Sequence, residues 1–266
     1  SGKTFTIEMG KDAASAVGDE VSLQFSGAVT AAGGNLAINS TDNSVAGSGN
    51  LVDFESTVTL GTLTVKAGDG GADAAGGTLG LVDLTGNSAI TTLTLQSGTG
   101  GAGAATAGGV LTVSDVGGDI SGTAFVVSGG DGAVSTFAGT GGGGGNTVIT
   151  TINGDVSSTT LTFQGGDGAA GTASNSGRAG GAGGTLDMNE LIDGAITSTT
   201  VNILGGAGGI GIENGTASAA GGAGGAIVNA NTFTSTIASV LNITGGAAGA
   251  AGAGTTAVGG AAGAGG

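Results

Sequence analysis

Six short segments of this chain share one pattern, in which a run of alternating apolar and polar residues passes directly into glycine. The segments are TLTVKAGDGG (62–71), TLTLQSGTGG (92–101), AFVVSGGDG (124–132), TLTFQGGDG (160–168), TVNILGGAGG (200–209) and VLNITGGAAG (240–249). Their last apolar strand residues are Val65, Leu95, Val127, Phe163, Ile203 and Ile243, spaced 30, 32, 36, 40 and 40 residues apart. Such self-similarity is typical of repeat architectures, in which each unit covers the apolar face of its neighbour.

The spacing grows because only the glycine-rich pieces lengthen. These pieces are 66–77, 96–109, 128–145, 164–184, 204–225 and 244–266, with 12, 14, 18, 21, 22 and 23 residues. The segments between them stay at 18 or 19 residues. A disordered linker has no reason to lengthen in order along the chain, so we interpret these pieces as arms built into the fold.

The constant part is interpreted as two strands joined by a turn. In TLGLVDLTGNSAITTLTL (78–95), one strand is expected around Leu79 and Leu81 and a second over Thr91 to Leu95. Period-2 alternation supports the second strand. Glycine with Asn or Asp marks the turn here and again at 117–119, 153–155 and 193–194, where we expect positive φ angles.

Stacking these repeats places like residues on like. The apolar column of the second strand is Leu63, Leu93, Phe125, Leu161, Val201 and Leu241, and the residues that follow it are Thr64, Thr94, Val126, Thr162, Asn202 and Asn242. The sequence therefore predicts an all-β fold, a parallel β-solenoid of about seven coils that advances roughly 4.8 Å per coil. We expect residues 1–47 to hold an N-terminal strand and the first irregular coils, and residues 48–266 to form one continuous repeat domain.

Within the arms, glycine recurs at every third residue. Examples are 165, 168 and 171, then 205, 208 and 211, and later 246, 249 and 252. Three residues per turn is the repeat of the polyproline-II helix, which makes no internal hydrogen bonds and needs partners for its backbone. Each long arm is also nearly symmetric about a polar tip. We therefore expect out-and-back arms of extended glycine helices that stack on one another, the alternative being solvated flexible loops.

Charge and residue usage exclude several function classes. The net charge is −15, with only Lys3, Lys11, Lys66 and Arg178 positive, which opposes binding to nucleic acid or to an anionic membrane. No apolar run reaches the length of a membrane span. The chain has no His or Cys, and its glycine-rich loops lack the lysine of a phosphate loop. We therefore predict no enzymatic activity and no cofactor.

One metal site is conceivable. Asp69, Asp131 and Asp167 occupy equivalent places in their repeats, so stacking would bring like charges together. A calcium ion with oxygen ligands would relieve their repulsion. The alternative is that water and salt screen these carboxylates.

The repeated GG-x-L-x-V and T-L-T-V segments resemble those of glycine-rich bacterial β-solenoid surface and adhesin-type proteins. The GGAGG arms look like glycine-rich regions of some phage tail-tip adhesins, and residues 48–266 carry the whole pattern. The resemblance implies a role at the cell surface or outside the cell. The phage adhesins carry aromatic residues at their arm tips, whereas the tips here (TASNS, IENGTAS and TTAV) have none.

The chain's ends suggest self-association. Thr4, Phe5, Thr6 and Ile7 repeat the apolar alternation of the strand that follows each arm, and the chain closes on a complete arm at Gly265 and Gly266. The sequence thus predicts a structural subunit of an extracellular filament or surface layer, a homopolymer joined head to tail through its N-terminal strand. Alternatives are an ice-binding protein or a surface adhesin that uses the stacked arms or the Thr ladder.

Overall fold

A computed structural model provides the structure of the chain. It describes residues 3–9, 22–40, 50–103, 105–135, 139–172, 178–188, 193–212, 219–228, 239–252 and 265. Across these residues the fold is all-β, with sixteen strands and no helix. Residues 1–2, 10–21, 41–49, 189–192, 229–238 and 266, and the tips of all arms but the first, lie outside the described part of the chain. The prediction of an all-β fold is confirmed.

Strand residues gather in a larger and a smaller sheet, and every pairing between strands is parallel. The larger sheet has the order β1 (Thr4–Met9), β3 (Val29–Ser40), β5 (Val58–Lys66), β7 (Ser88–Gln96), β10 (Ala124–Ser128), β12 (Val156–Gln164), β14 (Ile196–Leu204) and β16 (Val240–Thr244), with the short β9 (Ile120–Ser121) between β7 and β12. The smaller sheet has the order β2 (Ser22–Phe25), β4 (Asn50–Phe54), β6 (Leu79–Leu84), β8 (Leu111–Val116), β11 (Thr147–Ile152), β13 (Leu186–Met188) and β15 (Ile227–Val228).

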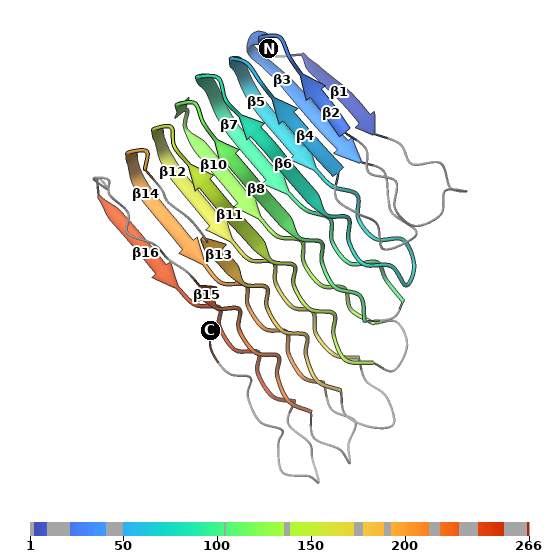
Figure 1. Cartoon of the computed structure of the whole chain (residues 1–266). Coiled ribbons are helices and arrows are strands. Elements are labelled where there is room, and N and C mark those ends of the chain that lie inside the picture. The colour runs from blue at the N-terminus through green and yellow to red at the C-terminus, as the bar shows by residue number, and fades with distance from the viewer. Residues whose placement is uncertain are drawn as a thin grey trace.

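From β2 onward the chain alternates between the two sheets, so each repeat adds a strand to each (Figure 1). Short turns such as 55–57 and 153–155 lead from the smaller sheet to the larger one, and glycine-rich arms lead back from β5 onward. The arms leave the larger sheet on the same side and run next to one another (Figure 1). This arrangement is consistent with the predicted solenoid.

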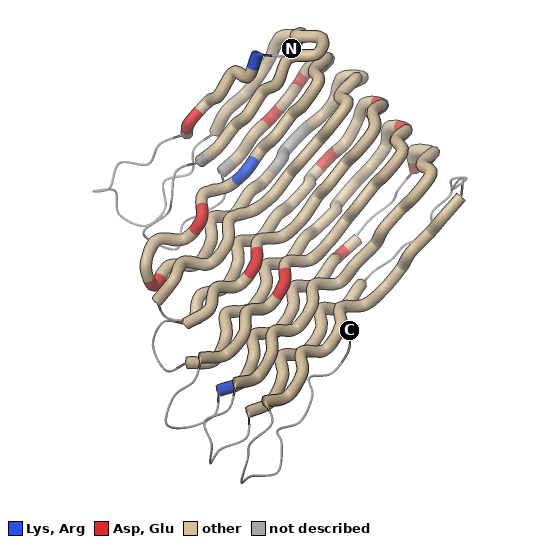
Figure 2. Tube along the Cα trace, turned by 180° about the vertical axis from the view of Figure 1, so that it is seen from behind, with Lys and Arg blue, Asp and Glu red and all other residues tan. Residues whose placement is uncertain are grey.

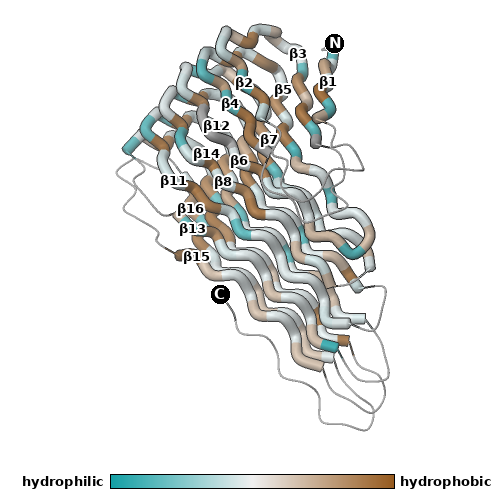
Figure 3. Tube along the Cα trace, turned by 45° about the vertical axis from the view of Figure 1, so that its right-hand side comes forward, coloured by the Kyte–Doolittle hydropathy of each residue, from teal (hydrophilic) through white to brown (hydrophobic). Residues whose placement is uncertain are grey.

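The hydrophobic core lies between the two sheets. The marker residues pair in register, with Val65 beside Leu95, Val127 beside Phe163 and Ile203 beside Ile243. Inward-facing residues of the inner strands are buried, whereas the arms are close to neutral in hydropathy (Figure 3). In the smaller sheet Phe25 and Phe54 stack with ring centroids 4.7 Å apart. The predicted apolar columns are therefore confirmed, and burial of like on like holds the sheets together.

The N-terminal strand takes a different place from the one predicted. Thr4–Met9 pairs with β3 in the larger sheet, where Phe5 lies beside Leu36 and Ile7 beside Ile38. It is therefore equivalent to Thr62–Lys66 and not to the strand that follows an arm. The alternation of apolar and polar residues is the same in both strand types, so pattern alone did not separate them.

The prediction of positive φ at the turns is wrong. The described residues with positive φ are Asp73, Gly33 and Gly103, and none lies in the repeated turns. The turn glycines serve close stacking instead. A Cβ on Gly154 would lie 2.1 Å from the backbone oxygen of Gly118, and one on Gly194 would lie 1.9 Å from that of Gly154.

Candidate functional site

Each arm consists of an outgoing leg and a return leg. The described outgoing legs are 67–73, 97–103, 129–135, 165–172, 205–212 and 245–252, and the described return legs are 74–77, 105–109, 139–145, 178–184 and 219–225. We call this two-layered set of legs the glycine lattice. Legs of one kind form one layer, and hydrogen bonds join legs within and between the layers.

One row of hydrogen bonds crosses between the layers without a break through all six arms. From donor N–H to acceptor oxygen it runs Gly246 to Gly225, Gly225 to Gly206, Gly206 to Gly184, Gly184 to Gly166, Gly166 to Gly145, Gly145 to Gly130, Gly130 to Gly109, Gly109 to Gly98, Gly98 to Gly77 and Gly77 to Gly68. The N···O distances lie between 2.7 and 3.2 Å. Outgoing and return legs therefore alternate along the row, and hydrogen bonds join each arm to the arm next to it.

A second set of bonds runs within each layer. In the outgoing layer Gly165, Gly168 and Gly171 donate to the next arm, at Leu204, Ala207 and Ile210. In the return layer Gly144 donates to Ala182, and Gly183 to Ala223, both at 2.8 Å. Of three successive residues in a leg, one thus points its N–H group to a neighbouring leg of the same layer, one to the other layer and one away from the lattice. A helix with three residues per turn requires this order.

Packing explains the glycines. A Cβ on Gly144 would lie 1.9 Å from the Gly166 oxygen, and one on Gly98 would lie 1.8 Å from the Gly68 oxygen. Gly143 is an exception in the same leg, since the nearest atom to its Cβ would be the Ala182 oxygen at 3.5 Å. Glycine is therefore required at close approaches such as those of Gly144 and Gly98, and is dispensable where a leg faces outward, as at Gly143.

The three aspartates singled out in the sequence lie on the outward side of the outgoing layer. Oδ1 of each accepts a hydrogen bond from a backbone N–H of the next arm. Asp69 accepts from Thr99 at 2.9 Å, Asp131 from Asp167 at 2.8 Å, and Asp167 from Ala207 at 2.7 Å. The carboxylates therefore satisfy the N–H groups that point away from the lattice.

The turns at 117–119 and 153–155 contain the same kind of hydrogen bond, which the turn pattern alone did not predict. Asp119 Oδ1 accepts from the Asp155 N–H at 2.9 Å, and Asp155 Oδ1 accepts from the Ala195 N–H at 2.7 Å. The recurrence of Asp after a turn glycine was the signal for it. Acidic residues accordingly lie along the arms and at the turns, with few basic residues among them (Figure 2).

Among the described residues, no group of three or more acidic, His or Cys side chains could hold a metal ion. Calcium binding at Asp69, Asp131 and Asp167 stays a prediction. Partial burial raises the pKa of Asp69, but hydrogen bonds from the Thr99 N–H and hydroxyl and the nearby Lys66 ammonium outweigh it. The pKa of this carboxyl is therefore lowered. Lys66 Nζ lies 3.2 Å from Asp69 Oδ1.

The two outer strands of the larger sheet, β1 and β16, expose apolar side chains on their core-facing side. Phe5 is 67% exposed, Leu241 43% and Ile243 51%, although their counterparts on inner strands, such as Leu63 and Val65, are fully buried. Among the described strands, β1 and β16 therefore each have one edge without a partner and leave core-facing apolar side chains partly exposed.

The remaining residues of the predicted polymerisation site are placed as follows. Thr4 and Thr6 are exposed on β1, and Ile7 is half-buried against the core. Gly265 is exposed, with nothing within 4 Å of a Cβ built on it. Gly266 lies outside the described residues. The structure thus places the strand residues at one end of the larger sheet.

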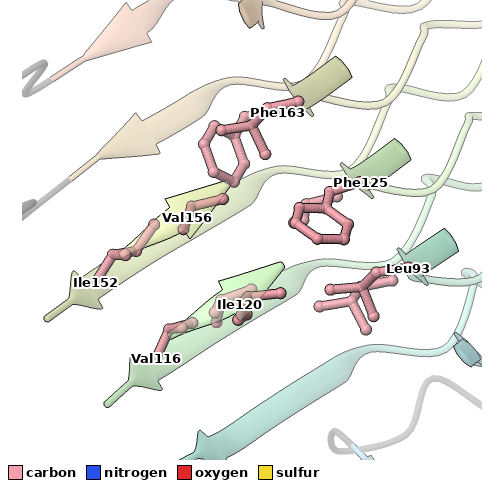
Figure 4. Close-up of a pocket in the computed structure, with 11 residues that line it drawn as sticks. Leu93, Val116, Ile120, Phe125, Ile152, Val156 and Phe163 are labelled. Carbon is pink, nitrogen blue, oxygen red and sulfur yellow. The ribbon is translucent and has the colours of Figure 1, made fainter. Parts of the chain in front are cut away.

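A small apolar cavity lies in the core between the sheets. It measures about 30 Å³, and its lining includes Leu93, Phe125 and Phe163 of the larger sheet and Val116 and Ile152 of the smaller one (Figure 4). Its exposed lining is wholly apolar, so a water molecule would find no partner there. The cavity is a packing gap and offers no ligand site.

Comparison of the chain with protein-family models, with curated proteins and with solved structures finds no match. The described residues contain no helix that could cross a membrane.

Proposed function

We propose that this chain is a structural subunit of an extracellular filament or surface layer. In this proposal the alternating strands form a parallel β-solenoid of about seven coils with stacked arms of polyproline-II type. Copies join head to tail, with β16 of one copy beside β1 of the next. An axial repeat on the order of 35 Å per subunit follows from the strand spacing.

The apolar exposure at β1 and β16 carries the proposal. Both strands are outer strands of the same parallel sheet, so one can extend the other. Continuing the register of the inner pairs would place Leu241 on Phe5 and Ile243 on Ile7. Those contacts would complete the burial of side chains that single copies leave partly exposed, and each would gain about half of the roughly 1.5–3 kcal/mol that full burial of a large apolar side chain gives. A contact between unlike ends does not close on itself, so it produces a filament.

Substitutions on β1 test the head-to-tail contact. Phe5→Lys places a charge on the core-facing side, and Thr6→Lys places the same charge on the adjacent outward-facing residue of the same strand. Both side chains are exposed in the single chain, so neither change should unfold it. Negative-stain micrographs and sedimentation should show fibres for the native chain and for Thr6→Lys, and monomers for Phe5→Lys.

Asn242→Lys and Ile243→Lys form the matching pair on β16, with Ile243 on the core-facing side. Loss of fibres only for Ile243→Lys would agree with the contact. Normal fibres from both Phe5→Lys and Ile243→Lys, or a native chain that stays monomeric at high concentration, would rule it out.

A further inference from the structure

The two outer faces of the glycine lattice differ in chemistry. The described outgoing legs carry Asp69, Asp73, Asp131 and Asp167, whereas the described return legs carry one ionisable side chain, Arg178. At a net charge of −15, the return face is therefore the side on which two copies could approach with least repulsion.

The return face also carries unpaired backbone donors. The outward N–H groups of Ala107, Gly143, Ala182 and Ala223 find no acceptor among the described residues. The corresponding groups of the outgoing layer are satisfied by carboxylates, as at Asp167 and Ala207. Ala107, Ala182 and Ala223 are exposed and present no more than a methyl group each, so at these positions the face is polar only through its backbone.

We propose that the return face binds the return face of a second copy of this chain. Donors on one return face need acceptors on the other, and the carbonyl oxygens of Gly144 and Gly183 likewise receive no hydrogen bond from the described residues. The contact between the two layers within the molecule is the template, because outgoing and return legs run antiparallel there and hydrogen-bond directly. Alanine is tolerated in that contact: Ala169 donates to Gly142 at 2.9 Å and accepts from Gly181 at 2.8 Å. A twofold axis would bring return legs together in the same antiparallel sense.

The size of the face indicates how strong the contact would be. Five described return legs of about six residues, at ~3.1 Å per residue and ~4.8 Å between legs, give on the order of 450 Å² per copy. The total of about 900 Å² falls just below the roughly 1,000 Å² of a stable interface. A single pair would thus be weak. The inference therefore rests on the proposed filament for its strength, because contacts repeated along two filaments add up and would bundle them side by side.

Single cysteines report on this contact cleanly because the chain has no Cys. Ala107→Cys lies on the return leg and Ala102→Cys on the outgoing leg of the same arm, and both native side chains are exposed. Each variant is treated with a short bis-maleimide at high protein concentration, and covalent dimers are measured on a denaturing gel. The dimer band should be several-fold stronger for Ala107→Cys, and micrographs of the native chain should show paired or bundled fibres.

The same measurement in a Phe5→Lys background separates this contact from head-to-tail stacking. If Ala107→Cys still gives the stronger dimer band in this background, the return-face contact is supported. The difference between the two bands should be smaller than in the native background, because single chains lose the contacts that repeat along a filament. Equal labelling of the two sites, or no dimer from either in both backgrounds, would overturn the contact. If the native chain forms single, unbundled fibres without the stronger Ala107→Cys band, the filament stands and the return-face contact fails. If Ala107→Glu abolishes thermal hysteresis without any dimer, the face binds ice and the contact is likewise wrong.

Discussion

The sharpest test of the glycine lattice compares alanine at two adjacent glycines, Gly143 and Gly144. In Gly144→Ala the new methyl group would lie 1.9 Å from the Gly166 oxygen and 2.4 Å from its carbonyl carbon. Both are backbone atoms, so the legs must separate to make room. In Gly143→Ala the nearest atom lies at 3.5 Å, an ordinary van der Waals distance.

The two variants should therefore change stability in opposite directions. Overpacking costs about 1–3 kcal/mol, and loss of the Gly144 to Ala182 hydrogen bond adds about 1 kcal/mol, so Gly144→Ala should destabilise by about 2–4 kcal/mol. Gly143→Ala meets no clash and restricts the unfolded chain, which should stabilise the fold by ~0.4–1 kcal/mol.

Thermal and urea unfolding followed by circular dichroism would measure both effects. At roughly 2–4 °C per kcal/mol for a chain of this size, Gly144→Ala should lower the melting temperature by about 4–16 °C. Gly143→Ala should leave it unchanged or slightly raised. Equal stability of both variants and the native chain would mean that the legs do not pack closely, and the lattice interpretation would be refuted.

Three further predictions follow from the same contacts. Hydrogen exchange in the return leg 219–225 should be slow at Gly222 and Gly225, which donate to Gly209 and Gly206, and fast at Ala223, which finds no described acceptor; uniform random-coil rates would contradict ordered arms. The pKa of Asp69 is lower in the folded chain than its ordinary 3.8, so its ionised form stabilises the fold above that pH, and the contribution is lost as pH falls through the folded-state pKa. The loss of stability should be small, because 42% of the Asp69 side chain is exposed. In Asp69→Asn, stability should therefore fall less steeply below about pH 4 than in the native chain. An acid unfolding curve identical to that of the native chain would contradict this prediction. Finally, a thermal-hysteresis assay should show no activity if the chain is a filament subunit, and activity that is lost in Thr94→Lys would favour the Thr ladder as an ice-binding surface.

The sequence by itself determined which residues are equivalent. A strand has period 2 and a glycine leg has period 3, so the letters alone assign Leu93, Phe125 and Leu161 to one inward column. They also show that the glycines at 165, 168 and 171 share one face, and all three donate to the next arm. Repetition made these assignments secure, because each column is read several times along the chain.

Only the tertiary structure decided what each equivalent position meets. The alternation of Thr4 to Ile7 fits either sheet, and pairing with β3 placed it in the larger one. Turn glycines such as Gly154 suggested positive φ, yet close stacking on Gly118 is what they serve. The role of Asp167 as an acceptor for Ala207, 40 residues later, likewise depends on the stacking of arms. Local patterns fix the direction in which a residue points, whereas its partner comes from a distant repeat and is set by how the repeats stack.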